Sequence, residues 1–125
     1  MGESSRDTAM DVLIDAIAAR DLPSTLDALS TVHEPSVIGS EREEGARGRE
    51  SVEAFFRRIY ARPDAFRFEF PQRSWILHGD VAWSVAEGTV VEPNGAASKP
   101  YRLTAVLIRE STGWKLALWS GAEPV

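Results

Sequence analysis

The sequence contains no cysteine, which excludes disulfide bonds, zinc–thiolate sites and thiol nucleophiles. It also has no run of about 18 apolar residues, the length that a helix needs to span a bilayer. The start of the chain, residues 1–11, is polar and acidic and lacks the apolar core of a signal peptide. These absences lead us to expect a soluble, cytoplasmic protein.

Clustered basic charge and histidine are also scarce. The net charge is -5, and the fourteen basic residues are scattered along the chain rather than gathered in one segment. Duplex nucleic acid requires a basic footprint that displaces counterions, so we expect no nucleic-acid partner. Arginine outnumbers lysine twelve to two, which hints at a GC-rich bacterial genome. The only histidines, His33 and His78, have no third ligand patterned around them, so we expect no metal and no cofactor.

The composition that remains is that of a globular domain. Apolar residues make up 43% of the 125 residues and charged residues 26%. A chain of this length buries roughly two-thirds of its unfolded surface. No internal repeat and no low-complexity linker appears, so residues 1–125 are expected to form one domain.

Helical patterns occupy the first half of the chain. Apolar residues recur at helical spacing over residues 5–20, and Asp21 can cap a second short helix. A short strand is predicted over residues 31–38. A third helix is predicted over residues 50–61, and Pro63 stops it. Residues 39–49 form the most polar segment, with an acidic cluster at Glu41, Glu43 and Glu44, and are expected to be a surface loop.

Strand patterns fill the second half. Short turns at Gly79-Asp80, Pro93-Asn94-Gly95 and Thr112-Gly113 separate long alternating runs. Strands joined in this way make an antiparallel meander. The predicted strands span residues 66–70, 74–78, 81–92, 101–109 and 114–121. Helices first and strands afterwards is the α+β pattern.

Several motifs resemble the SnoaL-like domains of the nuclear transport factor 2-like superfamily, whose fold is related to ketosteroid isomerases. These motifs are Val37–Ser40, Gly48–Phe56, Gly79–Trp83, Arg102–Val106 and Gly113–Leu116. Their order and spacing extend over nearly the whole chain. The resemblance implies a cone-shaped, strongly curved mixed or antiparallel sheet wrapped around three helices from the N-terminal half. It also implies an apolar pocket inside the cone and a homodimer formed through the outer face of the sheet.

The same resemblance, with strict alternation along each strand, predicts which residues line the pocket. On the strand 81–92 we expect Trp83, Val85, Glu87 and Thr89 inside, although a one-residue slip would invert the assignment. The full predicted lining is Leu13, Ile17, Phe55, Ile59, Trp83, Val85, Glu87, Leu103, Leu107, Leu116, Leu118 and Ser120. The set predicted to face outward is Ala82, Ser84, Ala86, Val106, Ile108, Ala117 and Trp119.

Few residues of the sequence are candidates for catalysis. The positions that match the donors and carboxylates of ketosteroid isomerases are Leu13, Gly39 and Ala105, and all three lack the necessary group. Glu87 is the candidate general acid or base, with Tyr101 as a candidate hydrogen-bond donor. Alternatively, Glu87 points outward or pairs with a cation such as Arg102. A further stretch, Gly45–Arg49, invites an anion-binding interpretation but lacks the Walker lysine.

Three functions therefore stay open. The first is a domain that binds a small apolar or amphipathic molecule in its cone, without assignable catalysis. The second is an enzyme of the isomerase, cyclase, dehydratase or epoxide hydrolase type that uses Glu87. The third is a homodimeric association module.

Overall fold

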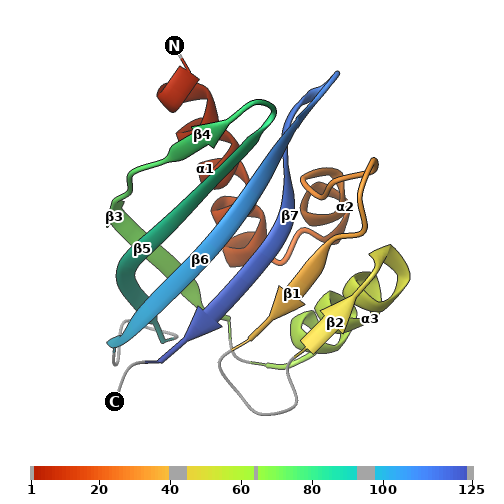
Figure 1. The fold of residues 1–125 in the computed structure, drawn as a ribbon. Helices are drawn as coiled ribbons and strands as arrows, with labels where there is room; N and C mark the ends of the chain where they lie inside the picture. Colours follow the sequence, from red (N-terminus) through yellow and green to blue (C-terminus); the bar gives the residue numbers. More distant parts are fainter. Residues whose placement is uncertain (1, 40–44, 64, 93–97, 124–125) are drawn as a thin grey trace.

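The computed structural model of the chain describes residues 2–39, 45–63, 65–92 and 98–123, in which three helices lie against a seven-stranded sheet (Figure 1). The helices are α1 (Gly2–Ala19), α2 (Leu22–Asp27) and α3 (Arg49–Tyr60). The strands are β1 (Ser36–Ile38), β2 (Gly45–Arg47), β3 (Arg67–Gln72), β4 (Ile76–His78), β5 (Val81–Val91), β6 (Ser98–Glu110) and β7 (Gly113–Ala122).

The three predicted helices are confirmed, and local chemistry explains their limits. Asp21 caps α2, because its side chain accepts a hydrogen bond of 3.1 Å from the Ser24 amide. A hydrogen bond from the Ser24 hydroxyl, together with this bond from the amide, lowers the pKa of Asp21. Helix α3 ends at Tyr60, shortly before Pro63, and buries the apolar stripe Val52, Phe55, Phe56 and Ile59.

The predicted α+β class with a mixed sheet is confirmed. The strand order is β2-β1-β7-β6-β5-β3, with β4 paired beside β5. Every pairing is antiparallel except β1 with β7, which is parallel. Strand β1 is shorter than expected, and β2 lies inside a segment predicted to be a loop. The acidic cluster at Glu41, Glu43 and Glu44 and the turn at Pro93-Asn94-Gly95 lie outside the described residues.

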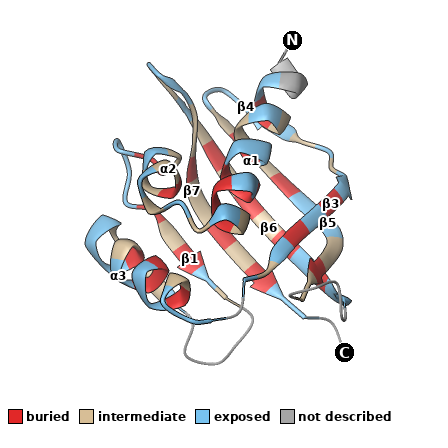
Figure 2. Ribbon diagram, turned by 180° about the vertical axis from the view of Figure 1, so that it is seen from behind, coloured by how far each residue is buried: buried red, intermediate tan, exposed pale blue. Residues whose placement is uncertain are grey.

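The core lies between the helices and one face of the sheet, which we call the inner face. Figure 2 views the molecule from this side, with α1 crossing the sheet and buried residues gathered beneath it. Helix α1 contributes Met10, Leu13, Ile14 and Ile17, each at most 5% exposed. The side of strand β5 that faces the core carries the small residues Ala82, Ser84 and Ala86, each at most 4% exposed. Burial of each large apolar side chain contributes about 1.5–3 kcal/mol to stability.

The opposite, outer face of the sheet carries no helix or strand from the described part of the chain, as the view in Figure 1 shows. None of the described helices has the length and apolar character that crossing a membrane requires.

Candidate functional site

Seven predicted pocket residues lie inside the cone, where they form part of its packed core. They are at most 7% exposed. This set is Leu13, Ile17, Phe55, Ile59, Leu103, Leu107 and Leu116. Their placement inside the cone follows the prediction, but they pack against one another and against α1 rather than facing an open space.

The orientation predicted for β5 is wrong. Directly opposite residues share a face, and β5 pairs Ala82 with Leu107 and Ala86 with Leu103. Because Leu103 and Leu107 face inward, the small residues Ala82, Ser84 and Ala86 face inward as well. The alternate set on the outer face is Trp83, Val85, Glu87 and Thr89.

Glu87 is therefore on the outer face, where its side chain is 75% exposed. It pairs with Arg102, the alternative considered from the sequence, at 3.4 Å between Oε1 and Nη2. The catalytic role predicted for Glu87 rested on loss of solvation inside the cone. On the surface Glu87 keeps its solvation, so the basis for that role is absent.

The orientation predicted for the second half of β7 is also wrong. The pairing register between β6 and β7 shifts between Val106 and Leu107, so one strand carries an extra residue. The shift turns Trp119 inward, where it is 4% exposed, and places Leu118 and Ser120 on the outer face. Strict alternation cannot anticipate such a bulge.

Tyr101, the second candidate catalytic residue, lies buried in an aromatic cluster. Its ring centroid lies 4.7 Å from that of Phe68, and Trp119 lies 5.0 Å from Phe68. The Trp119 indole donates a hydrogen bond of 3.1 Å to the Tyr101 hydroxyl. Gly121 sits directly under that hydroxyl, where a Cβ would come within 1.6 Å of it. The cluster therefore fills this part of the cone with close packing.

Three enclosed side-chain atoms of the described residues lack a hydrogen-bond partner, and one of them belongs to the inner face of the sheet. The Ser84 hydroxyl on β5 is enclosed and makes no hydrogen bond. It faces a narrow cavity that is too tight to admit a water molecule. The lining residues are Met10, Phe70, Arg73, Trp75, Ser84, Ala86, Leu103 and Ala105. The only sequence signal for this site is a lone serine in a run of small residues. That run is predicted from the sequence to face outward.

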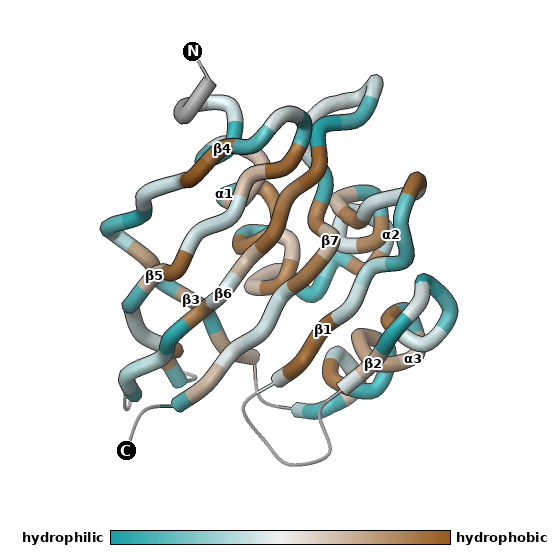
Figure 3. Tube along the Cα trace, in the orientation of Figure 1, coloured by the Kyte–Doolittle hydropathy of each residue, from teal (hydrophilic) through white to brown (hydrophobic). Residues whose placement is uncertain are grey.

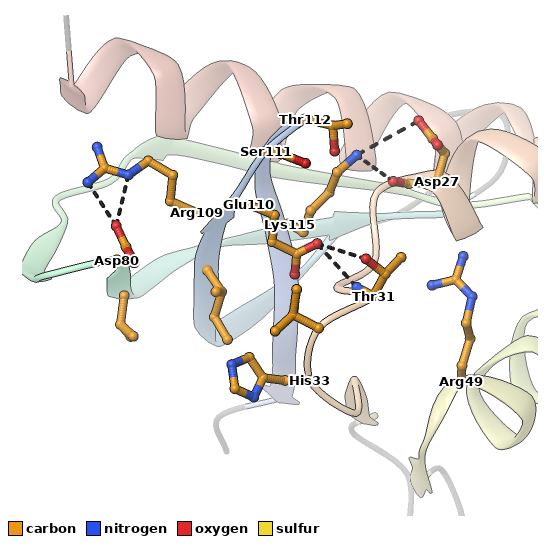
Figure 4. Close-up of a pocket in the computed structure, with 13 residues that line it drawn as sticks. Asp27, Thr31, His33, Arg49, Asp80, Arg109, Glu110, Ser111, Thr112 and Lys115 are labelled. Carbon is orange, nitrogen blue, oxygen red and sulfur yellow. Dashed lines mark hydrogen bonds and ion pairs between the residues drawn. The ribbon is translucent and has the colours of Figure 1, made fainter.

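A wider groove of about 680 Å³ lies at the end of the sheet formed by the β6–β7 hairpin (Figure 4). The segment from the end of α2 toward β1 forms one wall. The hairpin and the start of β5 form the other. The lining residues are Asp27, Thr31, Val32, His33, Arg49, Asp80, Val81, Ile108, Arg109, Glu110, Ser111, Thr112 and Lys115.

Most charged groups in this groove already bind other parts of the chain. The Glu110 carboxylate accepts hydrogen bonds from the Ser30 hydroxyl and from the amide and hydroxyl of Thr31. Partial desolvation acts to raise the pKa of Glu110, but these bonds and one from the Val32 amide hold it below its usual value. Arg109 binds Asp80 at 2.8 Å (Figure 4), and Lys115 donates to the Asp27 carbonyl at 2.7 Å. Ion pairs and hydrogen bonds of the lining residues thus hold the two walls of the groove together.

The remaining sequence candidates are spread over the surface. His33 and His78 are both exposed, and His33 lies on the rim of the groove. The described residues contain no group of three or more side chains that could hold a metal ion. The Gly45–Arg49 stretch forms β2 and the start of α3, and its Arg49 donates to the carbonyls of Leu26 and Ser30.

A curved mixed sheet packed on one face against three helices defines an α+β cone domain. The chain belongs to the SnoaL-like domain family, whose pattern matches residues 7–124. This confirms the resemblance seen in the sequence. No curated protein shows significant similarity to the chain.

Solved structures share the fold at low sequence identity. A candidate dehydratase of the nuclear transport factor 2-like family from Streptomyces avermitilis has a TM-score of 0.87 at 16% identity, covering 99% of this chain and 96% of its own. A candidate calcium/calmodulin-dependent protein kinase type II association domain from Thiobacillus denitrificans has 0.82 at 20%, covering 95% and 94%. A ketosteroid isomerase-like protein from Erwinia carotovora atroseptica has 0.69 at 16%, covering 98% and 95%. These similarities concern the fold alone.

Proposed function

We propose that this SnoaL-like domain works as a homodimer that pairs through the outer face of its sheet. The observation that carries the proposal is a continuous apolar row across four strands. Ile76 stands opposite Trp83, Trp83 opposite Val106, and Val106 opposite Leu118. The tube in Figure 3 shows apolar segments on these strands.

Exposure marks this row as an uncovered surface. In the single chain Ile76 is 57% exposed, and Val85 in the neighbouring row is 61% exposed. Ile38 on β1 lies in that neighbouring row and is 48% exposed. Monomers rarely leave contiguous apolar patches of this kind open to water, and larger ones mark interaction sites.

The charges around the row favour an identical copy as the partner. Glu87 pairs with Arg102 on this face, so the two charges there offset each other. A second copy therefore meets little net like charge at this pair. A two-fold axis places the same patch on both subunits, and an apolar row beside a neutral ion pair suits that arrangement.

Sedimentation tests this proposal directly. At micromolar concentration the wild-type chain should sediment as a dimer, and Val85→Lys should sediment as a monomer with unchanged circular dichroism. Val12→Lys is the matched control, because Val12 is a 52% exposed valine on α1 rather than on the outer face. A wild-type monomer, or a Val85→Lys dimer, would contradict the proposal.

A second function, compatible with the first, is the binding of a small apolar or amphipathic molecule inside the cone. The unpartnered Ser84 hydroxyl in an apolar cavity favours it. A buried hydroxyl without a partner destabilises the fold by about 1–3 kcal/mol, and a ligand that supplies the missing hydrogen bond removes that cost. Thermal shift with phenol-sized ligands tests it: wild type should be stabilised, and Ser84→Ala much less so. Equal shifts in both proteins would contradict a site at Ser84.

The enzyme hypothesis through Glu87 is not part of this proposal, because Glu87 is solvated and paired on the outer face. The expected cytoplasmic location and bacterial source stay predictions.

A further inference from the structure

The cavity at Ser84 is covered by an arginine. Arg73 lies in the short connection between β3 and β4, and its side chain is only 15% exposed. Arg73 and Trp75 belong to the cavity lining, together with Met10 from α1. The sheet residues of the lining are the small Ser84 and Ala86 on β5 and Ala105 on β6, together with the larger Phe70 on β3 and Leu103 on β6. Arg73 and Trp75 are thus the polar-anchored side of a cavity whose other walls are mainly apolar.

The cover is tied to α1 by polar contacts. The Arg73 guanidinium donates to the Asp7 carbonyl at 3.2 Å and forms an ion pair with the Asp11 carboxylate. Trp75 Nε1 donates to Asp7 Oδ1 at 2.8 Å. A further bond of 3.0 Å joins Arg73 Nε to the Phe70 carbonyl on its own strand. Apart from this last bond, these contacts join the β3–β4 connection to one stretch of α1.

Those ties are weak enough to open. The Asp7 and Asp11 side chains are 38% and 57% exposed, so water can solvate both carboxylates when the arginine moves away. Residues 73–75 lie between two strands, so moving them breaks no pairing of the sheet.

We propose that Arg73 and Trp75 form a gate, held shut by Asp7 and Asp11, over a binding site whose polar contact is the Ser84 hydroxyl. The ligand class is a small, mainly apolar molecule with one hydrogen-bonding group, because the walls are apolar and Ser84 is the single unpartnered polar atom among the described lining residues. The inference rests on the ligand-binding function proposed above and adds the route of entry.

Calorimetric titration with phenol and with toluene tests the gate. The two probes are similar in size, and only phenol can bond to Ser84. Arg73→Ala should bind phenol about tenfold or more tightly than wild type. Adding Ser84→Ala to Arg73→Ala should weaken phenol binding about tenfold, as expected for one hydrogen bond, and leave toluene binding unchanged.

The matched control is Arg67→Ala. Arg67 also joins β3 to α1, through an ion pair of 3.9 Å with Asp15, but both side chains are more than half exposed and neither lines the cavity. It should bind both probes as wild type does. Asp11→Asn loosens the gate without touching the core, so it tests the proposal even if Arg73→Ala does not fold. This variant should bind phenol more tightly than wild type.

The outcomes separate the gate from the ligand site. If wild type binds phenol through Ser84 and neither Arg73→Ala nor Asp11→Asn changes its affinity, the gate is wrong and the ligand site stands. If folded Arg73→Ala and Asp11→Asn bind neither probe, both the gate and the ligand site are overturned.

Discussion

Glu87 lies directly opposite Arg102 on neighbouring antiparallel strands, and their side chains form an ion pair on the outer face of the sheet. Its place on the outer face shows the orientation of β5, since the neighbours Ala86 and Gly88 then face the helices. The pair lies on the same face as the apolar row that we propose for dimerisation and leaves little net charge there. The carboxylate that was the best catalytic candidate in the sequence is thus a surface residue next to the proposed interface.

Replacing Glu87 should have little effect on the folded chain. Both partners are at least half exposed, and such ion pairs contribute about 0–1 kcal/mol. We expect Glu87→Gln to keep the free energy of unfolding within about 0.5 kcal/mol of wild type in urea titrations. A large loss of stability or of ligand binding in this variant would mean that Glu87 does more than pair with Arg102.

Gly88 should be far less tolerant than Gly45, although both are strand residues. A Cβ on Gly88 would lie 1.9 Å from the Glu69 carbonyl oxygen and 2.8 Å from the Phe70 ring, whereas Gly45 has no atom within 4 Å. Forcing such a contact costs about 1–3 kcal/mol or more. Urea unfolding of Gly88→Ala and Gly45→Ala should show a clear loss only in the first. Similar stabilities would mean that β3 and β5 separate easily here.

Glu110 should stabilise the chain in a pH-dependent way. Its pKa is lowered in the folded state, so its contribution is complete above the ordinary value of 4.5 and is lost as the pH falls through the lowered value. Glu110→Gln should therefore reduce stability by about 1 kcal/mol at neutral pH, and the difference from wild type should shrink in acid. Chemical unfolding at several pH values measures this.

The control for Glu110 is Glu53→Gln, which removes only the exposed pair with Arg57 on α3. It should change stability less at neutral pH. A Glu110 effect that stays constant down to strongly acidic pH would show that the carboxylate charge is not its source.

Ser84→Ala should stabilise the protein when no ligand is present. The substitution removes a buried hydroxyl that has no partner and keeps the packing volume nearly unchanged. We expect a gain of about 1 kcal/mol, seen as a higher midpoint of thermal unfolding. Loss of stability instead would show that the hydroxyl has a partner in solution.

Local sequence patterns predicted most of the fold. The helical spacing around Leu13, the Asp21 cap and the Pro63 stop are each set by a few neighbouring residues, and α1, α2 and α3 follow them. The turn at Gly79-Asp80 likewise delimits β4 and β5. Strand β2 was missed because its three residues, Gly45–Arg47, carry no alternating apolar pattern and gain their strand conformation by pairing with β1.

The sequence by itself determined the α+β class and the helices, because periodicity and turn chemistry act over short distances along the chain, and its motifs indicated the family. Only the tertiary structure decided which side of β5 and β7 faces the core. That choice depends on how β5 and β6 are paired and on the bulge opposite Val106 and Leu107, and a shift of one residue exchanges the two faces. Each face of β5 carries enough apolar residues to pack against the helices. The pairing turns the small residues around Ser84 toward the helices and leaves Trp83 and Val85 on the outer surface, where a second copy can cover them.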